Sequence, residues 1–405
     1  MVRGNLVKMN IVFLTLVEIN SIQERGIYQD LLRKFRDEGH DVTVVTPVER
    51  RRNIATNFNN KDGISILQVK TFNIQKTNII EKGIGTIAIE YQYLSAIKKF
   101  TSNKKFDLVL YSTPPITFAK VIEYVKKRDL AKSYLLLKDI FPQNAVDMNM
   151  LKEGGILHRQ FLKKEKKLYK ISDAIGCMSP ANVKFLLTHN PEIASDKVEV
   201  NPNTIEPITF DYTDEQKLEI RHKYGIPVDK TVFVYGGNLG KPQGLNFLLD
   251  TINATENKNV FFLIVGDGTE FLKIKEWFNI HQPQNAALLQ RLPKEDYDRL
   301  LAACNIGLIF LDKKFLIPNF PSRLLSYLEM KMPVLAATDP NTDIGDIIEK
   351  AECGYKVLAG EQVEMQQKIG YLMSTDLVRM GENAEKLLID EYKVDRSYRL
   401  IVEKI

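Results

Sequence analysis

The sequence predicts an α/β protein with two Rossmann-like, doubly wound domains in series. Its 405 residues exceed the size at which a single hydrophobic core usually stops growing. Strand-like segments alternate with helical ones along most of the chain, which favours parallel sheets with helices on both faces. The alternation lapses once, from Ile205 to Asp214, and then resumes. We therefore expect domains over residues 1–205 and 206–389, facing each other across a ligand-binding cleft, and a final helix over 390–405 that packs back on the first domain.

The predicted elements follow in a regular order. The first domain is expected to begin with a strand over Ile11–Leu16 and a helix over Gly26–Glu38, in which apolar residues recur at helical spacing and which Gly39 is placed to end. Its further strands are expected at Val42–Thr46, Ile64–Val69, Leu108–Tyr111, Ser133–Leu137, Ala174–Met178 and Val198–Val200. The second domain is expected to begin with a helix over Asp214–Tyr224. Its strands are expected at Thr231–Tyr235, Val260–Val265, Ala287–Leu289, Ile306–Phe310 and Val334–Ala337.

The composition is that of a globular protein, with 44% hydrophobic and 26% charged residues. No apolar run approaches the roughly 18 to 20 residues that a membrane-spanning helix needs. Cys177, Cys304 and Cys353 lie far apart without C-x-x-C spacing, which argues against a disulfide framework and favours a cytoplasmic protein. The net charge of +5 is uneven, about +11 over residues 1–200 and about −6 over the remainder. The basic first half can indicate nucleic acid or an anionic lipid surface as a partner. A solvated lysine-rich face without a partner is the alternative.

The strongest local signal is the glycine-rich segment VFVYGGNLGKPQGLNFLL at Val232–Leu249. A buried strand there runs into three glycines, Gly236, Gly237 and Gly240, and a helix is expected to begin near Gln243. Glycines let the backbone turn sharply and approach a ligand, and the first amides of a helix attract phosphate. The segment matches neither a dinucleotide-binding nor a Walker motif, so a glycine-rich turn without a ligand stays open as the alternative.

A second signal lies in FLIPNFPSRLLSYLEMKMPVLAA at Phe315–Ala337, where Pro321 and Ser322 are typical of a helix start. Arg323 would then lie in the first turn, where a positive charge opposes the helix dipole. That choice is reasonable if an anion binds next to it. An exposed arginine on a surface helix is the alternative.

Eight segments form an ordered pattern along nearly the whole chain. They are an opening strand, loop and helix that lead to GHDVTVVTP (Gly39–Pro47), then YSTPP (Tyr111–Pro115), KDIFPQNAV (Lys138–Val146), SDAIGCMSPANV (Ser172–Val183), VNPNTIEP (Val200–Pro207), GGNLGKPQGL (Gly236–Leu245), VGDG (Val265–Gly268) and IPNFPSRLLSYLEMKMPVLAATD (Ile317–Asp339). In order and spacing they resemble the retaining glycosyltransferases of the GT-B fold, family 4, especially those of bacterial capsule and O-antigen clusters. The resemblance implies a UDP-activated hexose or N-acetylated amino sugar as donor, an undecaprenyl-diphosphate-linked sugar as acceptor, and neither a metal nor another cofactor. It also implies a cytoplasmic protein bound peripherally to the anionic inner face of the plasma membrane, with no nucleic acid as partner.

By this resemblance the second domain binds the nucleotide diphosphate of the donor. The residues expected around it are Gly237, Asn238, Leu239, Gly240, Lys241, Gln243, Ser322, Arg323 and Ser326, and the loop at Arg291 and Leu292 is expected to receive the base. Lys241 and Arg323 are the expected catalytic cations. The family usually carries two glutamates eight residues apart, and those places here hold Pro318 and Ser326. Glu329 lies one turn further on and is either an exposed glutamate or a substitute for the missing pair.

The first domain is expected to bind the acceptor. Asp139 follows a strand, at the carboxyl end where ligands of parallel sheets bind, and is the expected catalytic residue that holds the acceptor hydroxyl. A cap on the next helix is the alternative role. Further acceptor-binding candidates are Glu24, Arg50, Gln143 and Asn144.

Other patterns bear on location and on rival functions. The segment RQFLKKEKKLYK, Arg159–Lys170, places five lysines beside Phe161, Leu162, Leu168 and Tyr169 and is expected to contact anionic lipid. Asp296 and Asp298 lie two apart in a predicted helix and point to different sides, which argues against a metal site. A nucleotide-sugar epimerase of the same fold and a non-catalytic partner subunit remain the two alternatives to a transferase.

Overall fold

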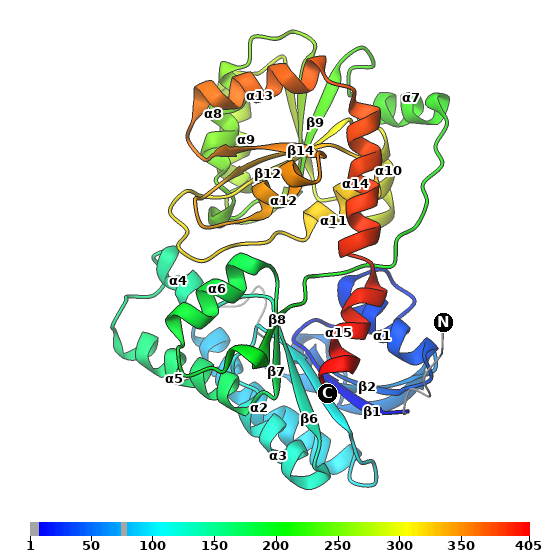
Figure 1. Ribbon diagram of the computed structural model, residues 1–405, viewed down its shortest axis with the longest axis vertical. Coiled ribbons are helices and arrows are strands. Elements are labelled where there is room, and N and C mark those ends of the chain that lie inside the picture. The colour runs from blue at the N-terminus through cyan, green and yellow to red at the C-terminus, as the bar shows by residue number, and fades with distance from the viewer. Residues whose placement is uncertain (1–7, 74–78) are drawn as a thin grey trace. The chain divides into compact units, whose positions relative to one another are not determined.

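The computed structural model describes residues 8–73 and 79–405. The chain divides into two compact units (Figure 1). Unit 1 comprises Met1–Glu206 and Val394–Ile405, and unit 2 comprises Pro207–Lys393. No helix among the described residues is long and apolar enough to cross a membrane.

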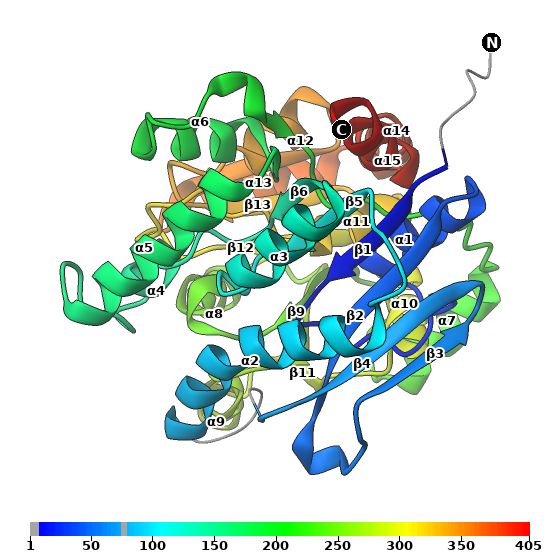
Figure 2. The same ribbon diagram turned by 90° about the horizontal axis from the view of Figure 1, so that it is seen from below.

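Unit 1 is built on a sheet of order β3-β4-β2-β1-β5-β6-β7-β8. Its strands are β1 Asn10–Leu14, β2 Asp41–Glu49, β3 Asn57–Lys61, β4 Ile64–Thr71, β5 Leu108–Ser112, β6 Lys132–Leu137, β7 Ala174–Cys177 and β8 Val198–Val200. Every neighbouring pair is parallel except β3 and β4, which form an antiparallel hairpin; Figure 2 shows both beside β2 and β1. The helices are α1 Ile27–Asp37, α2 Ile79–Phe100, α3 Ala119–Asp129, α4 Gln143–Asp147, α5 Ile156–Ile171, α6 Pro180–His189 and α15 Val394–Lys404, with short 3-10 turns η1 Arg50–Arg52 and η2 Ser195–Lys197.

The C-terminal helix α15 returns to unit 1 and packs against α1. The Tyr398 ring lies 5.0 Å from the Phe35 ring, and its hydroxyl lies 2.9 Å from Nε2 of the buried His40. Lys34 on α1 pairs with Asp395 on α15 at 2.8 Å. The apolar face of α15 is thereby part of the unit 1 core.

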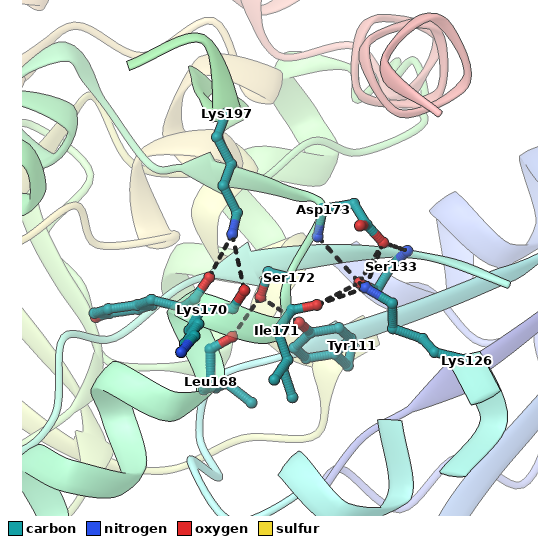
Figure 3. Close-up of polar contacts among 10 residues, drawn as sticks. Tyr111, Lys126, Ser133, Leu168, Lys170, Ile171, Ser172, Asp173 and Lys197 are labelled. Carbon is teal, nitrogen blue, oxygen red and sulfur yellow. Dashed lines mark hydrogen bonds and ion pairs between the residues drawn. The ribbon is translucent and has the colours of Figure 1, made fainter. Parts of the chain in front are cut away.

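Two lysines from outside α5 satisfy the carbonyls at its C-terminus (Figure 3). The last carbonyls of a helix have no partner within the helix. Lys126 donates to the Ile171 carbonyl at 2.6 Å and pairs with Asp173 at 2.6 Å. Lys197 donates to the Tyr169 carbonyl at 2.6 Å and to the Lys170 carbonyl at 3.3 Å. These cations also interact favourably with the negative end of the helix dipole. They therefore stabilise the C-terminal end of α5, just before β7.

Unit 2 is built on a sheet of order β11-β10-β9-β12-β13-β14, in which all the neighbouring pairs are parallel. Its strands are β9 Thr231–Asn238, β10 Val260–Asp267, β11 Ala286–Gln290, β12 Ile306–Phe310, β13 Val334–Thr338 and β14 Gly354–Leu358. Its helices are α7 Asp214–Lys223, α8 Leu245–Ala254, α9 Phe271–His281, α10 Lys294–Ala302, α11 Arg323–Glu329, α12 Ile344–Lys350, α13 Gln362–Ser374 and α14 Leu377–Glu391, with a 3-10 turn η3 Lys241–Gln243. Two doubly wound α/β layouts are thus present, as the alternation of elements predicts.

The helix expected near Gln243 begins two residues later, at Leu245. Gln243 instead ends the 3-10 turn η3, and Gly244 separates the turn from α8 with a φ of 57°. A Cβ on Gly244 would lie 2.6 Å from the Leu311 carbonyl oxygen, so glycine is required there both by conformation and by space. The expected helix start, near Gln243, thus lies within two residues of the observed one.

The segment that joins the two units is hydrogen-bonded on both sides of Pro207. The Glu206 amide donates to Oδ2 of the buried Asp30 in unit 1 at 2.9 Å. The Ile208 amide donates to Oε1 of Glu329 in unit 2 at 3.0 Å. Glu329 is only 7% exposed, so the first of its two expected roles, an exposed glutamate, was wrong. Its carboxylate holds the joining segment because the last turn of α11 lies against that segment.

One carboxyl group in α5 gives a prediction about stability and pH. Glu165 is buried and accepts a hydrogen bond from the Tyr169 hydroxyl at 2.7 Å. Desolvation by burial raises the pKa of Glu165 to about 7, although the Tyr169 bond lowers it in part. The folded protein therefore holds this proton more tightly than the unfolded chain, whose carboxyl titrates near 4.5. The stability it contributes is present below pH 4.5 and is lost as the pH rises through about 7.

We expect Glu165→Gln to remove this loss, because the amide stays neutral. At pH 8 the free energy of unfolding of the variant should be about 3 kcal/mol above that of the wild type, and the difference should disappear near pH 4.5. Urea unfolding at pH 4.5, 6 and 8 measures it. Glu153→Gln, at an exposed glutamate before α5, is the control and should show no such pH dependence. Parallel pH profiles for wild type and Glu165→Gln would contradict the assignment.

Candidate functional site

The glycine-rich segment lies at the carboxyl ends of the parallel strands β9 and β10, the edge of such a sheet where ligands bind. Gly237 has a φ of 117°, which favours glycine. A Cβ on Gly266 would lie 2.0 Å from the Gly237 carbonyl oxygen, so the two strand ends run together without room for side chains. Gly237 and Asn238 are exposed, whereas Leu239 is fully buried and offers only its backbone. The loop therefore presents main chain and the Asn238 side chain at this edge.

Arg323, the first residue of α11, lies beside this loop. Its guanidinium carbon lies 4.2 Å from the centre of the Tyr235 ring. Its Nη2 donates to Oε1 of Gln243 at 2.6 Å and lies 3.8 Å from where a Cβ on Gly237 would be. Nη1 is buried and has no hydrogen-bond partner among the described residues. The side chain is half-buried, so the alternative of an exposed surface arginine is excluded.

The charge of Arg323 has no counterion within the part of the chain that the structure describes, because no carboxylate there forms an ion pair with it. Enclosing a cation without a partner is costly, and a bound anion would remove that cost. Guanidinium groups bind phosphate well because their donors form a planar fork. The arrangement therefore suits a phosphate group next to the Gly237 main chain.

Three tyrosines surround this cation and were not indicated by the sequence. Tyr235 lies beneath the guanidinium, and its hydroxyl donates to the Asn238 carbonyl at 3.0 Å or to Gln243 at 3.2 Å. The Tyr327 hydroxyl accepts from the Gly236 amide at 3.2 Å. The Tyr297 hydroxyl fills the space beside Gly236, where a Cβ would lie 1.7 Å from it. In the sequence, the one feature that could have indicated them is Tyr235, an aromatic residue directly before the paired glycines Gly236 and Gly237.

The structure brings together only some of the residues expected around the diphosphate. Gly237, Asn238, Gln243 and Arg323 form one cluster. Among the described residues, no hydrogen bond or ion pair joins the other expected residues to Arg323. Gly240 is buried, Lys241, Arg291 and Ser322 are exposed, and Leu292 and Ser326 are half-buried. The Gln243 side chain faces Arg323 and Tyr235.

In unit 1, Asp139 follows β6 and lies beside the end of β5. The amides of Lys138 and Asp139 donate to the Thr113 hydroxyl at 3.1 and 3.3 Å. The Asp139 side chain is exposed at this edge, and partial desolvation by the neighbouring protein atoms raises its pKa above its usual range. Burial also raises the pKa of Tyr28 to about 12, and the nearby Asp139 charge adds to this. The cap position of α4 is Pro142, without a side-chain cap, so Asp139 does not cap that helix.

Lys138 is a second polar group at this edge that the sequence argument missed. Its ammonium donates to the Asn201 carbonyl at 3.3 Å, and burial lowers its pKa to about 7. The only sequence feature that could have indicated Lys138 is its position directly before Asp139.

Within the described part of the chain, no hydrogen bond or ion pair joins the remaining acceptor candidates to Asp139. Gln143 donates to Asp147 within α4 at 2.8 Å, and Asn144 has a buried Oδ1 without a partner among the described residues. Glu24 is exposed, and Arg50 lies 5.5 Å from the Phe72 ring.

The described residues contain no group of three or more His, Cys, Asp or Glu side chains arranged as metal ligands. Asp296 and Asp298 lie on α10 and take different partners. Lys223 is 3.8 Å from Asp296, and Lys294 pairs with Asp298. The two carboxylates therefore point apart, as their spacing on a helix predicts.

The sequence and the fold were compared with those of known proteins. Residues 216–387 match the family described as glycosyl transferases group 1. The chain is 23% identical to the glycosyltransferase WbjE of Pseudomonas aeruginosa over an alignment of 319 residues. That alignment covers 78% of each chain. It is 23% identical over 161 residues, 39% of both chains, to the colanic acid biosynthesis glycosyl transferase WcaI of Escherichia coli K12. The solved structure of Anabaena Alr3699/HepE in complex with UDP superposes with a TM-score of 0.69 at 14% identity, covering 98% of this chain and 99% of that one.

The fold is therefore GT-B, as the sequence resemblance implies. The glycosyl transferases group 1 match covers most of unit 2, including the glycine loop and Arg323. These findings support a glycosyltransferase.

Proposed function

We propose that the protein is a retaining, family 4 glycosyltransferase that moves a hexose or N-acetylated amino sugar from a UDP-sugar to an undecaprenyl-diphosphate-linked saccharide. The observation that carries the proposal is the enclosed Arg323 guanidinium without a counterion beside the Gly237 main chain. The HepE structure, of the same fold, was solved with UDP. The name of WcaI refers to colanic acid synthesis, which supports a role in capsule or O-antigen type polysaccharide synthesis.

The chemistry follows from the charge that develops on the leaving group. As the bond between the sugar carbon and the diphosphate oxygen breaks, negative charge grows on the diphosphate. A fixed guanidinium and main-chain amides that meet this charge lower the barrier, because they need no reorganisation during the reaction. Arg323 is fixed in this way by Tyr235 and Gln243. Asp139, with its raised pKa, is the group that we assign to the acceptor hydroxyl.

The site favours a transferase over the two alternatives. An epimerase needs carboxylates or histidines placed for elimination and addition, whereas the described neighbours of Arg323 are tyrosines, a glutamine and glycine main chain. A non-catalytic subunit has no need to retain an enclosed cation that lacks a counterion. An intact Arg323 cluster therefore supports an active donor site.

Incubation of the protein with a panel of nucleotide sugars and a lipid-linked saccharide tests the proposal, with free UDP and glycosylated lipid as readouts. We expect transfer from at least one UDP-sugar with retention of the anomeric configuration. Asp139→Asn should lose transfer while UDP affinity, measured by calorimetry, stays within about two-fold, because that residue belongs to unit 1. Epimerised nucleotide sugar without transfer, or no UDP binding at all, would refute the proposal.

The two expected cations should contribute very differently to turnover. Arg323→Ala should lower kcat by roughly 10²- to 10³-fold, comparable to the loss of one preorganised oxyanion donor. Lys241 is exposed, and exposed ion pairs contribute less, so Lys241→Ala should lower kcat by less than about ten-fold. Steady-state kinetics on both folded variants measures this. Near wild-type turnover of Arg323→Ala would show that the phosphate site lies elsewhere.

We also propose that unit 1 binds the inner face of the plasma membrane through the start of α5. Leu168 and Tyr169, two of the apolar residues expected to contact lipid, are instead buried in unit 1. The exposed apolar side chains at this end are Met150, Ile156 and Leu157, at 68%, 78% and 58%. Basic residues flank them, and the exposed ones are Lys152, Arg159 and Lys163. Apolar side chains that can insert and lysines that attract anionic lipid suit a membrane surface.

Vesicle flotation tests this surface. We expect binding to vesicles that contain anionic lipid, weakening with salt by about 1 kcal/mol for each lysine screened, and none to neutral vesicles. The double variant Ile156→Ser, Leu157→Ser should float several-fold less. Leu272→Ser, at a residue of unit 2 that is 77% exposed, is the matched control and should bind as wild type. Equal flotation with neutral vesicles, or none with either, would contradict the proposal.

A further inference from the structure

The Gln243 side chain is buried against the cation of the candidate phosphate site. It is 8% exposed, and its Oε1 accepts from Nη2 of Arg323 at 2.6 Å and lies 3.2 Å from the Tyr235 hydroxyl. A guanidinium can only donate, so the oxygen of the amide, not the nitrogen, must face it. The carbonyl oxygen thus accepts from Arg323, and the Tyr235 hydroxyl can donate either to it or to the Asn238 carbonyl.

The backbone holds this amide in a fixed place. The Gln243 amide donates to the Gly240 carbonyl at 3.1 Å within the turn η3. The Asp312 amide donates to the Pro242 carbonyl at 3.0 Å, which ties the turn to the end of β12. The required glycine at 244 then starts α8 directly afterwards. The backbone that carries the Gln243 side chain is thus held in place. We infer that Gln243 fixes the position of the Arg323 guanidinium, and not the reverse.

The chemical type of the residue is as informative as its position. A carboxylate at this place would hold Arg323 equally well but would neutralise its charge. An apolar residue would leave the charge intact but would not fix the plane of the guanidinium. A neutral amide fixes the plane and leaves the full positive charge available, while the Tyr235 ring supports one face of the guanidinium. Nη1 remains without a protein partner.

We propose that Gln243 is a positioning residue that orients Arg323 toward the diphosphate of the donor without neutralising it, in place of the donor contact that the sequence suggests for it. This inference rests on the proposed function, since it assigns a task within the donor site. The Gln243 amide acts through Arg323 and does not touch the ligand.

Two substitutions separate orientation from charge. Gln243→Met keeps the volume and removes the acceptor, so Arg323 keeps its charge and loses its orientation. We expect kcat to fall roughly ten-fold or more with the donor KM within about two-fold, because orientation matters most where charge develops. Gln243→Glu keeps an acceptor and neutralises the guanidinium. We expect UDP affinity, measured by calorimetry, to fall about ten-fold or more.

The decisive readout is coupling to Arg323. In an Arg323→Ala background, Gln243→Met should change kcat, and Gln243→Glu should change UDP affinity, by less than about two-fold. Gln366→Met is the control, since that half-buried glutamine on α13 also hydrogen-bonds within the protein but lies outside the Arg323 cluster. It should match wild type in both measurements. Thermal unfolding confirms that each variant is folded.

Effects that persist undiminished without Arg323 would overturn the inference, because they would show that Gln243 contacts the ligand itself. Wild-type behaviour of both Gln243 variants would overturn it as well. The calorimetric arm needs no turnover. If no nucleotide sugar is a substrate, the proposed function fails, whereas the coupling between Gln243 and Arg323 in UDP binding is still decided.

Discussion

The enclosed, positively charged Arg323 side chain is the constraint around which the end of β9 is arranged. A guanidinium without a carboxylate partner must be stabilised by neutral groups, and here these are a tyrosine ring and an amide oxygen. The glycines of the loop leave main chain next to it, where larger residues would fill the space. The protein thereby keeps one unneutralised charge at the carboxyl edge of a parallel sheet, the edge at which ligands of such sheets generally bind.

Much of the fold could be predicted from the sequence, because buried parallel strands are short apolar segments between glycines, prolines and helices. The strands β3 and β14 could not be found in this way. β3 has the polar sequence NFNNK and lies at an exposed edge, so it has no apolar pattern. Its one signal was the Asp62–Gly63 turn, in which both residues have a positive φ, as a tight hairpin requires. β14 is also an edge strand with few buried residues.

The site could be predicted as far as residue type and chain position determine it. The glycine loop and Arg323 carry chemistry that few other roles explain. The contacts of Gln243 and Glu329 could not be predicted, because both depend on the direction in which a side chain leaves a short element. Gln243 lies in a 3-10 turn where a helix was expected, and Glu329 turns toward the joining segment instead of solvent. Lys241 is close in sequence to the loop, yet its side chain remains exposed.

The hydrogen bond between Ile208 and Glu329 has a mechanical consequence. Glu329 is the last residue of α11 and Arg323 is the first, so one rigid rod about 10 Å long connects the joining segment to the enclosed cation. Tension on the chain at Ile208 is therefore applied to the far end of that rod. We therefore expect the position of Arg323 to respond to a change in the path of the backbone beside Pro207.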